Sequence, residues 1–173
     1  MALPRTYDGQ NCAIARSLEI IGERWTLLIV RDAFYGVTRF VDFRDHLDIP
    51  RAVLAERLAL LVEHEVLTRV AGTSGRDEYA LTAKGRRLWP VVWSLSTWGN
   101  AFYVQDGERR LTTHAACDTP IAADASCPNC RIVPDVAELI LQPRPVEEGR
   151  RTDPVSVVLE QPHRMLEPIA VHA

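Results

Sequence analysis

The sequence of 173 residues has no long apolar run and no strong net charge. A helix that crosses a membrane needs roughly 18 or more apolar residues in succession, whereas the apolar runs here are short, such as TLLIV. The first ten residues, MALPRTYDGQ, lack the apolar core of a signal peptide. We therefore expect a cytoplasmic protein without a membrane partner. The formal net charge of −3 also argues against indiscriminate binding of polyanions.

Motifs of the common enzyme classes are absent as well. The chain contains no G-x-S-x-G, no G-x-x-x-x-G-K-[ST] and no G-x-G-x-x-G, the patterns of a hydrolase nucleophile, a phosphate-binding loop and a dinucleotide site. The histidines are scattered, and we interpret His46 and His64 as a helix-end and a surface histidine. We predict that the protein is not an enzyme and binds no organic cofactor.

Helical patterns dominate the first half of the chain. With 47% hydrophobic and 25% charged residues, the chain is long enough for one domain with a core and a smaller appendage. Thr38 is a candidate N-cap of the third helix, and Pro50 suits the first turn of the fourth. Apolar residues recur at helical spacing in four segments, residues 11–21, 23–36, 37–47 and 50–63.

A hairpin pattern follows these helices. The strand-like runs LTRVA and DEYAL flank the polar tip GTSGR and predict a β-hairpin. Thr82 can cap a further helix that runs to about Val104, and Pro90 should kink it. Three short helices followed by a two-stranded hairpin are typical of a winged helix. We therefore predict a mainly α fold, a winged helix-turn-helix with a small β-hairpin wing.

The sequence pattern changes after Asp106 from helical to loop-like, and we place a domain boundary there. Residues 1–107 are predicted to form the winged helix-turn-helix domain for DNA binding and dimerisation. Residues 108–173 are predicted to form a small C-terminal extension that is zinc-ribbon-like or irregular. Within it, VAELIL and VSVVL are predicted as strands.

The charge distribution assigns any anionic partner to the first half. Residues 38–87 contain nine Lys/Arg and eight Asp/Glu, whereas residues 108–173 contain seven Arg and ten acids. The fourth helix should bury its leucines and present alanines and Glu56 outward. Alanines let a helix backbone approach base edges, Glu56 can accept a hydrogen bond from cytosine, and arginines nearby can pair with phosphates. The candidate DNA-binding residues are Arg39, Arg44, Arg51, Ala52, Ala55, Glu56, Arg57, Arg69, Arg76 and Lys84.

An alternative applies to each single arginine of this set. Arg57, for example, has Glu56 and Glu63 nearby on the same helix and can be an ordinary ion-paired residue. This alternative is weaker for Arg76, because Arg76 lies at a hairpin tip where a side chain has no core to pack against. The candidate set as a whole is therefore a stronger indication of DNA binding than any single arginine in it.

Several motifs occur together in a recognisable order, namely CAIARSLEIIGERWTLLIVRDAFYGVTRFVDFRDHL, LAERLALLVEHEVL, EYALTAKGR and WG. From Cys12 to Gly99 the chain resembles the HxlR-type winged helix-turn-helix transcriptional regulators of bacteria. The resemblance implies a homodimer with two recognition helices that read a palindromic operator. It places the recognition helix at residues 51–63 and the wing at residues 68–81. Ile49-Pro50 stands where the family often has Ser-Pro, and Glu65 stands where a glycine usually follows.

The same resemblance implies that the N-terminal helix and the long C-terminal helix pack across a two-fold axis. The aromatic residues along the long helix also form a larger apolar surface than the core of one small domain can bury. We expect the dimer interface to include Ile14, Leu18, Leu95, Trp98 and Phe102.

Two features suggest an effector. Cys12 starts the first helix, where a helix N-terminus lowers the pKa of a thiol, and a cysteine there senses oxidants or electrophiles in some members of the family. The alternative for Cys12 is a small apolar residue at the dimer contact. Trp89, Trp93, Trp98 and Phe102 can line a cavity for a small aromatic effector, or they simply fill the core.

Metal-ligand residues form two pairs in the C-terminal extension. His114 and Cys117 form H-x-x-C, and Cys127 and Cys130 form C-P-x-C after nine intervening residues. Two such pairs on tight turns can hold one zinc ion tetrahedrally. We predict one structural zinc per chain, and the alternatives are a metal-free remnant or a Cys127–Cys130 disulfide.

A comparable Cys-rich tail occurs in part of the HxlR-type family, with a glycine after each ligand pair. Here Asp118 follows Cys117 and Arg131 follows Cys130.

Together these features predict a sequence-specific DNA-binding transcriptional repressor. It would act as a homodimer on a palindromic operator, under control of a small aromatic or electrophilic molecule or of its thiol state. The alternative is a winged-helix protein–protein interaction module that no longer binds DNA.

Overall fold

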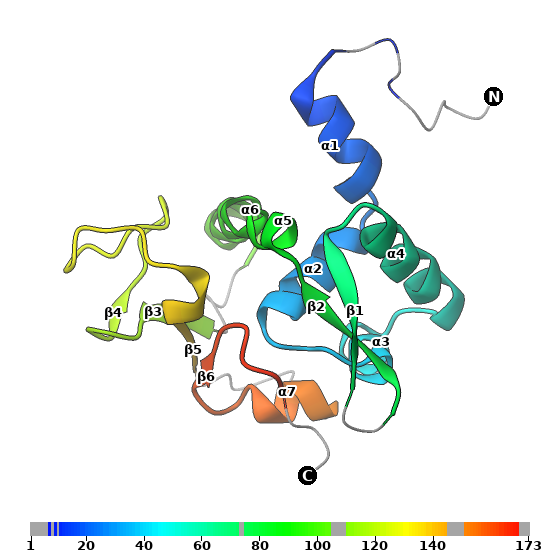
Figure 1. The fold of residues 1–173 in the computed structure, drawn as a ribbon. Helices are drawn as coiled ribbons and strands as arrows, with labels where there is room; N and C mark the ends of the chain where they lie inside the picture. Colours follow the sequence, from blue (N-terminus) through cyan, green and yellow to red (C-terminus); the bar gives the residue numbers. More distant parts are fainter. Residues whose placement is uncertain are drawn as a thin grey trace.

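The computed structural model of the protein describes residues 7, 9, 11–72, 75–104, 110–144 and 151–169. The first half has the predicted order of helices and hairpin (Figure 1). Its helices are α1 (Ala13–Ile21), α2 (Thr26–Phe34), α3 (Phe40–Leu47), α4 (Arg51–Glu63), α5 (Ala83–Arg86) and α6 (Trp89–Phe102). The strands β1 (Leu67–Ala71) and β2 (Asp77–Leu81) pair antiparallel and form the wing. The predicted winged helix-turn-helix is confirmed.

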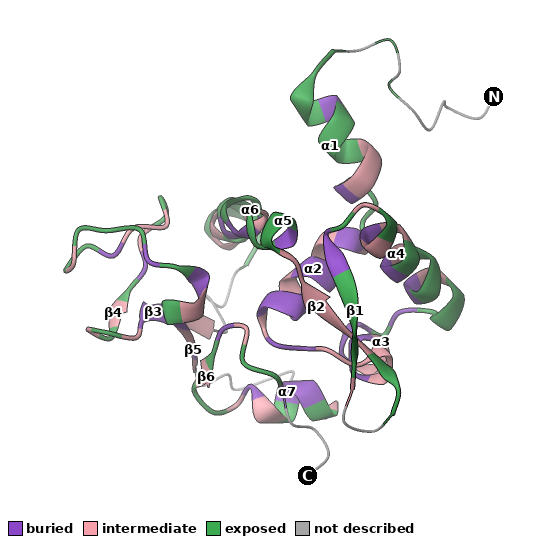
Figure 2. Ribbon diagram, in the orientation of Figure 1, coloured by how far each residue is buried: buried purple, intermediate pink, exposed green. Residues whose placement is uncertain are grey.

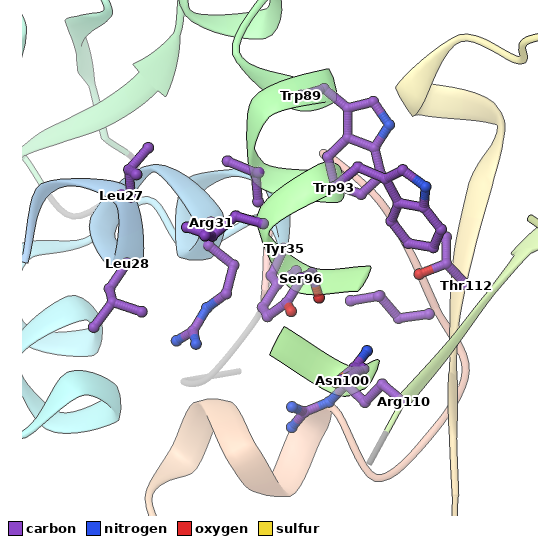
Figure 3. Close-up of a pocket in the computed structure, with 13 residues that line it drawn as sticks. Leu27, Leu28, Arg31, Tyr35, Trp89, Trp93, Ser96, Asn100, Arg110 and Thr112 are labelled. Atoms are coloured by element: carbon purple, nitrogen blue, oxygen red, sulfur yellow. The ribbon is translucent and has the colours of Figure 1, made fainter. Parts of the chain in front are cut away.

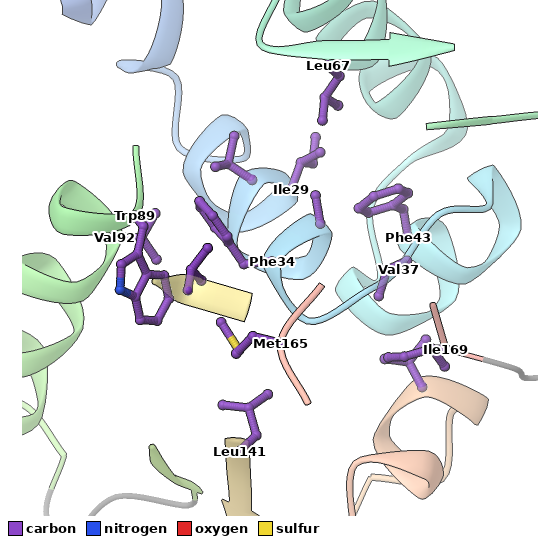
Figure 4. Packing of buried hydrophobic residues seen from close by; sticks show 14 of the residues in the cluster. Ile29, Phe34, Val37, Phe43, Leu67, Trp89, Val92, Leu141, Met165 and Ile169 are labelled. Carbon is purple, nitrogen blue, oxygen red and sulfur yellow. The ribbon is translucent and has the colours of Figure 1, made fainter. Parts of the chain in front are cut away.

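The core is built around α2, which is buried on most of its surface. Ile29, Val30 and Phe34 are inaccessible to solvent and pack with leucines of α4 and with Phe43 of α3. Figure 4 shows side chains from several elements, such as Phe43, Leu67 and Trp89, around Ile29 and Phe34 of α2. Each large apolar side chain that is buried in this way contributes about 1.5–3 kcal/mol relative to an exposed one. The burial of α2 therefore fixes the positions of α3 and α4.

Thr38 does not cap α3, contrary to our prediction. Arg39 occupies the N-cap position and makes no side-chain capping bond. The Thr38 hydroxyl instead donates to Glu78 at 2.9 Å, and its carbonyl accepts from Tyr79 N at 2.8 Å. The hydroxyl and the backbone are thus both used to attach the segment before α3 to β2 of the wing.

The predicted long helix is interrupted. Thr82 caps α5 as predicted, because its hydroxyl accepts from Gly85 N at 3.0 Å. However, α5 ends at Arg86 and α6 begins at Trp89. Proline cannot donate a backbone hydrogen bond and clashes with the carbonyl four residues earlier. For Pro90 that residue is Arg86, where α5 ends, and Pro90 then lies in the first turn of α6, which tolerates it.

The C-terminal half forms a second, four-stranded antiparallel sheet in the order β4-β3-β5-β6. Its elements are β3 (Arg110–His114), β4 (Thr119–Pro120), η1 (Val136–Glu138), β5 (Leu139–Pro143), α7 (Pro154–Val158) and β6 (His163–Arg164). VAELIL therefore divides into a 3-10 turn and the start of β5. The prediction of a strand at VSVVL is wrong, since this segment lies in α7. Asp153 accepts from Ser156 N at 3.0 Å and Pro154 takes the first helical position, and these start signals outweigh the preference of valine for strands.

The last described residues pack back onto the winged helix of the same chain. Leu166 N donates to Phe34 O at 2.8 Å, and Ile169 N donates to Gly36 O at 2.9 Å. Met165 and Ile169 are buried in the same apolar cluster as Phe34, as Figure 4 shows. The loop between α2 and α3 is therefore held from one side by the C-terminal segment.

Within the described ranges, none of the helices combines the length and the apolar character that crossing a membrane requires.

A substitution at Gly36 tests the attachment of the C-terminal segment to the loop between α2 and α3. The φ of +90° at Gly36 disfavours any side chain, and a Cβ would also collide with the carbonyl oxygen of Glu167. We expect Gly36→Ala to lower the free energy of unfolding by about 3 kcal/mol, since strain and overpacking add. The matched control is Gly75→Ala, with φ +73° but no atom within 4 Å of the added Cβ, which should cost about 1–2 kcal/mol. Urea unfolding followed by circular dichroism gives both values, and equal losses would contradict the proposed close contact.

Candidate nucleic-acid interface and metal cluster

Helix α4 has one buried and one exposed face, as its sequence predicted. Leu54, Leu58 and Leu61 are fully buried. On the opposite side Ala52, Ala55 and Glu56 are exposed, together with Arg51 at the first helical position. Figure 2 shows this outer side of α4 as an almost continuous exposed strip. The exposed face is thus composed mainly of short side chains, which allow close approach of another surface to the helix backbone.

The arginines around α4 differ in how far they are already engaged. Arg51 is exposed, with its guanidinium 5.7 Å from the ring of Phe40. Arg57 pairs with Glu56 at 3.0 Å, and Arg44 pairs with Asp45 at 2.6 Å. These two form surface ion pairs with their neighbours, the alternative that the sequence left open. Such pairs contribute about 0–1 kcal/mol and exchange readily for another anion.

The wing adds two exposed cations. Arg69 lies on β1 opposite Tyr79, and Arg76 directly precedes β2. The tip is closed by a bond from Gly72 N to Arg76 O at 3.0 Å. Arg39 lies at the N-cap of α3, next to Thr38, whose bonds to Glu78 and Tyr79 of β2 place it beside the wing.

Lys84 is engaged differently from the arginines. Its ammonium group donates to His64 O at 2.7 Å, at the C-terminal end of α4. A cation at this end of a helix is favourable for the helix dipole. Lys84 therefore stabilises α4, in addition to any contact with phosphate.

A buried ion pair between α2 and α3 was not found from the sequence. Asp32 has no exposed surface, and its Oδ1 accepts from Arg31 Nη2 at 2.7 Å. Its Oδ2 lies 2.7 Å from Nδ1 of His46, which is buried and lies in the last turn of α3, the helix-end position that we expected. The signal was present, because Asp32 shares the helical face of Leu28 and Ile29, and a carboxylate on an apolar face requires a partner.

The four predicted metal ligands lie together. Their ligand atoms all lie within 4.8 Å of one another. The sulfur of Cys117 is 3.5 Å from His114 Nδ1, 3.5 Å from the sulfur of Cys127 and 3.6 Å from that of Cys130. His114 ends β3, and Cys127 is buried while Cys117 and Cys130 are partly exposed. This arrangement can accommodate a metal ion.

The turns around the ligands are typical of metal-binding knuckles. Cys130 N donates to the sulfur of Cys127 at 3.5 Å, and Arg131 N donates to Cys127 O at 2.8 Å. Asp118 N likewise donates to His114 O at 2.8 Å. Asp118 and Arg131 have φ values of 54° and 57°, the left-handed region that favours glycine. Asp118 and Arg131 therefore replace glycine at two positions where the backbone conformation favours glycine.

Hydrogen bonds of its side chain offset the cost of the left-handed conformation at Asp118, and Arg131 lacks this compensation. The Asp118 carboxylate accepts from Thr113 at 3.2 Å and from Gln142 at 3.2 Å. Aspartate also tolerates the left-handed region better than most residues. Arg131 has neither advantage, so its conformation costs roughly 1 kcal/mol or more.

The thiols differ in acidity. Hydrogen bonding with Thr119, and then with Cys127 and Cys130, lowers the pKa of Cys117 to about 6. The hydrogen bond that Cys130 donates to Cys117, and then its burial, raise the pKa of Cys130 to about 11. Cys117 is thus the thiol that most readily supplies a thiolate to a cation.

Cys12 and the predicted dimer residues are exposed in the single chain. Cys12 lies at the N-cap of α1, and Arg16 one turn on pairs with Glu19 at 3.1 Å. The five predicted interface residues are all exposed, up to 71% for Phe102. They are Ile14 and Leu18 on α1 and Leu95, Trp98 and Phe102 on α6. Two of the four residues predicted to line a cavity do so, namely Trp89 and Trp93.

The packed helices α2 to α4, the exposed face of α4 and the two-stranded wing define a winged helix-turn-helix protein. The model of HxlR-like helix-turn-helix proteins matches residues 20–107, and the chain belongs to this family, as its motifs predicted. The HTH-type transcriptional regulator Rv3095 of Mycobacterium tuberculosis is 37% identical over 131 residues, which cover 74% of this chain and 82% of that protein. The HTH-type transcriptional regulator YvaP of Bacillus subtilis is 35% identical over 86 residues, 48% of this chain and 80% of that protein.

Among solved structures, the crystal structure of PA1607, a candidate transcription factor, is similar to this protein. It has 36% sequence identity and a TM-score of 0.58, and the match covers 69% of this chain and 95% of PA1607. The protein is thus a helix-turn-helix protein of a transcriptional regulator family.

Arg131 provides a test of the knuckle geometry. We expect Arg131→Gly to raise the free energy of unfolding by about 1 kcal/mol, because glycine adopts a φ of 57° without steric cost. Arg131→Ala is the matched control, since it removes the same side chain but keeps the Cβ that causes the cost. Urea unfolding measures both variants. A gain in Arg131→Ala equal to that in Arg131→Gly would assign the effect to the guanidinium instead.

Proposed function

We propose that the protein is a sequence-specific DNA-binding transcriptional repressor that acts as a cytoplasmic homodimer on a palindromic operator. The observation that carries this proposal is the exposed face of α4, which combines short side chains with a border of exposed cations. Ala52 and Ala55 let the helix lie deep in a major groove, and Glu56 reaches base edges there. Arg51 and the wing residues Arg69 and Arg76 then bind phosphates on either side.

Dimer formation supplies the second half of the operator contact. Helix α1 projects from the rest of the chain (Figure 1) and exposes Ile14 and Leu18. Helix α6 exposes Leu95, Trp98 and Phe102, and the rings of Trp98 and Phe102 pack at a tilt of 52° with their centroids 5.9 Å apart. Exposed apolar residues that cluster in this way are typical of an interface. In a two-fold dimer these surfaces meet their copies, and two α4 helices face the DNA. A dimer bound at a promoter excludes polymerase, which is the basis of repression.

We further propose that His114, Cys117, Cys127 and Cys130 hold one structural zinc ion per chain. Tetrahedral zinc with Zn–S bonds of about 2.3 Å places its sulfur ligands about 3.8 Å apart, close to the sulfur–sulfur distances of 3.5 and 3.6 Å at Cys117. Four protein ligands leave no open position for a substrate, so the metal would stabilise the fold. It would join the turn after β3 to the C-P-N-C knuckle.

The DNA-binding face is tested with a charge placed at its centre. We expect Ala55→Asp to weaken binding to the promoter beside its own gene at least about tenfold, because a buried like charge against phosphate costs several kcal/mol. Ala123→Asp adds the same charge at an exposed position in the C-terminal half and should bind like the unaltered protein. Fluorescence anisotropy with labelled promoter DNA measures both. Equal affinities for the two variants would contradict α4 as the reader, and no binding by the unaltered protein at low salt would favour the protein-interaction module.

The dimer interface is tested by Phe102→Glu. A charge at this exposed position of α6 should convert the dimer to a monomer, because it cannot be buried unpaired. Val157→Glu on α7 is the control, since Val157 is also an exposed apolar residue but lies outside the proposed interface. Light scattering coupled to gel filtration gives the masses. A dimer of Phe102→Glu with unchanged dissociation would contradict this interface.

The zinc site is tested by metal analysis of protein purified without a histidine tag. We expect about one zinc per chain, its loss in Cys127→Ser, and a clearly lower melting temperature in that variant, because zinc binding stabilises the folded chain. Cys12→Ser should keep both the metal and the stability. A zinc content near zero in the unaltered protein would rule out the structural site.

A further inference from the structure

Three sulfur atoms of the metal cluster are in mutual contact through Cys117. The Cys117 sulfur lies 3.5 Å from the Cys127 sulfur and 3.6 Å from the Cys130 sulfur. A disulfide bond is about 2 Å long, so each of these contacts exceeds the bond by about 1.5 Å. Any oxidised sulfur at Cys117 therefore has two thiols beside it that can react with it.

Hydrogen bonds of the protein itself hold the thiol-bearing turns in this position. Cys127 N donates to Ile132 O at 2.8 Å and closes the turn around the C-P-N-C segment. The loop that joins the two ligand pairs is attached to α6, because Trp93 Nε1 donates to Ala122 O at 3.0 Å. Figure 3 shows the indole of Trp93 extending from α6 towards Thr112 of β3. The sulfurs are thus brought together by the fold, and a bond between two of them closes no long loop.

The three thiols differ in how far solvent reaches them. Cys127 has no exposed surface and belongs to the buried apolar cluster of the core. Its sulfur also accepts a hydrogen bond from Cys130 N at 3.5 Å. Cys117 and Cys130 are partly exposed, so a solute reaches them and their sulfurs move at a smaller cost in packing. Contact and exposure together single out Cys117 and Cys130.

We propose that Cys117 and Cys130 form a reversible disulfide when a hydroperoxide oxidises the cluster. The Cys117 sulfur attacks one peroxide oxygen and the O–O bond breaks, which leaves a sulfenic acid on Cys117 and releases an alcohol, or water from hydrogen peroxide. The Cys130 sulfur then attacks the Cys117 sulfur, and the S–O bond breaks. The thiol proton of Cys130 leaves with the hydroxyl group as water. The two cysteines are oxidised by two electrons and the peroxide is reduced.

This pairing differs from the Cys127–Cys130 disulfide that the C-x-x-C spacing suggests. The disulfide itself does not need a metal, whereas its effect on zinc rests on the proposed metal site. A Cys117–Cys130 bond removes two of the four ligands and leaves His114 and Cys127, which are too few to hold zinc tightly. A hydroperoxide would therefore release the ion, and reduction by a thiol would restore the site.

The pairing is tested by differential alkylation of the full chain after treatment with hydrogen peroxide. Free thiols are blocked with N-ethylmaleimide in denaturant, the disulfides are reduced, and the thiols that this frees are labelled with iodoacetamide. Trypsin leaves the three cysteines in one peptide, residues 111–131, and fragmentation in the mass spectrometer locates each label. We expect the iodoacetamide label on Cys117 and Cys130 and the maleimide on Cys127. Dithiothreitol before alkylation should place maleimide on all three.

Two variants separate the steps. Cys130→Ser removes the second thiol and should leave a sulfenic acid on Cys117 that dimedone traps. Cys12→Ser is the control and should form the same disulfide as the unaltered protein, because Cys12 lies at the N-cap of α1 and not in the cluster. An iodoacetamide label on Cys127 of the unaltered protein, or maleimide on all three cysteines after peroxide, would overturn the proposal. This readout of the unaltered protein does not depend on how the variants fold.

Zinc release is measured in the same samples with the coloured chelator 4-(2-pyridylazo)resorcinol. We expect about one zinc per chain to be released by peroxide in step with the disulfide. Zinc that stays bound to the oxidised protein would overturn the loss of metal. A Cys117–Cys130 disulfide in protein that carries no zinc before treatment would refute the proposed zinc site and support the disulfide.

Discussion

The fully buried carboxylate of Asp32 is the interaction on which the arrangement of this protein depends. It lies between α2 and α3 and has two partners, Arg31 on its own helix and His46 on the next. A buried carboxylate without partners is strongly unfavourable, so the pair holds α2 and α3 in one relative position. Apolar packing of Leu54, Leu58 and Leu61 against α2 tolerates small shifts, whereas the hydrogen bonds of Asp32 are directional. Both interactions set the orientation of α4, the helix that we propose reads DNA.

The same region is supported from the C-terminal half. Helix α7 packs against α3, and its N-cap Asp153 lies near His46. Burial opposes the charge of Asp153, but hydrogen bonds from Ser156 and attraction to His46 hold its pKa below the ordinary value. The segment after β6 bonds to the α2–α3 loop at Phe34 and Gly36. The metal ligand His114 pairs with Leu139 of β5, and Met165 N after β6 donates to Leu139 O at 2.9 Å. A zinc ion at the cluster would therefore lie close to the point from which this segment leaves the sheet.

Much of the fold could be predicted from the sequence because local signals and tertiary packing agree there. The leucine spacing of α4 and the glycines around the wing tip each have one structural interpretation, and the spacing of the paired ligands predicts which side chains meet. The two failures have different causes, namely a contact with a distant part of the chain and a helix-start signal that outweighs strand preference. Thr38 bonds to β2 instead of capping α3, and VSVVL forms a helix because Asp153-Pro154 starts one that packs on α3.

The site was predicted less completely than the fold, for a related reason. Functional residues that lie close together in the sequence, such as Cys127 and Cys130, can be recognised by their spacing. Arg31 and Arg110 lie on different halves of the chain and both contact Tyr35. No spacing rule relates them, so this contact follows only from the three-dimensional structure.

The central claim is that two copies of α4 read one operator from the same side of the DNA. Hydroxyl-radical footprinting on the promoter beside the gene tests it most directly. The account predicts two equivalent protected patches about 10 base pairs apart, or a whole number of helical turns apart, related by the symmetry of the sequence. A single unpaired patch, or no protection at low salt, would contradict it.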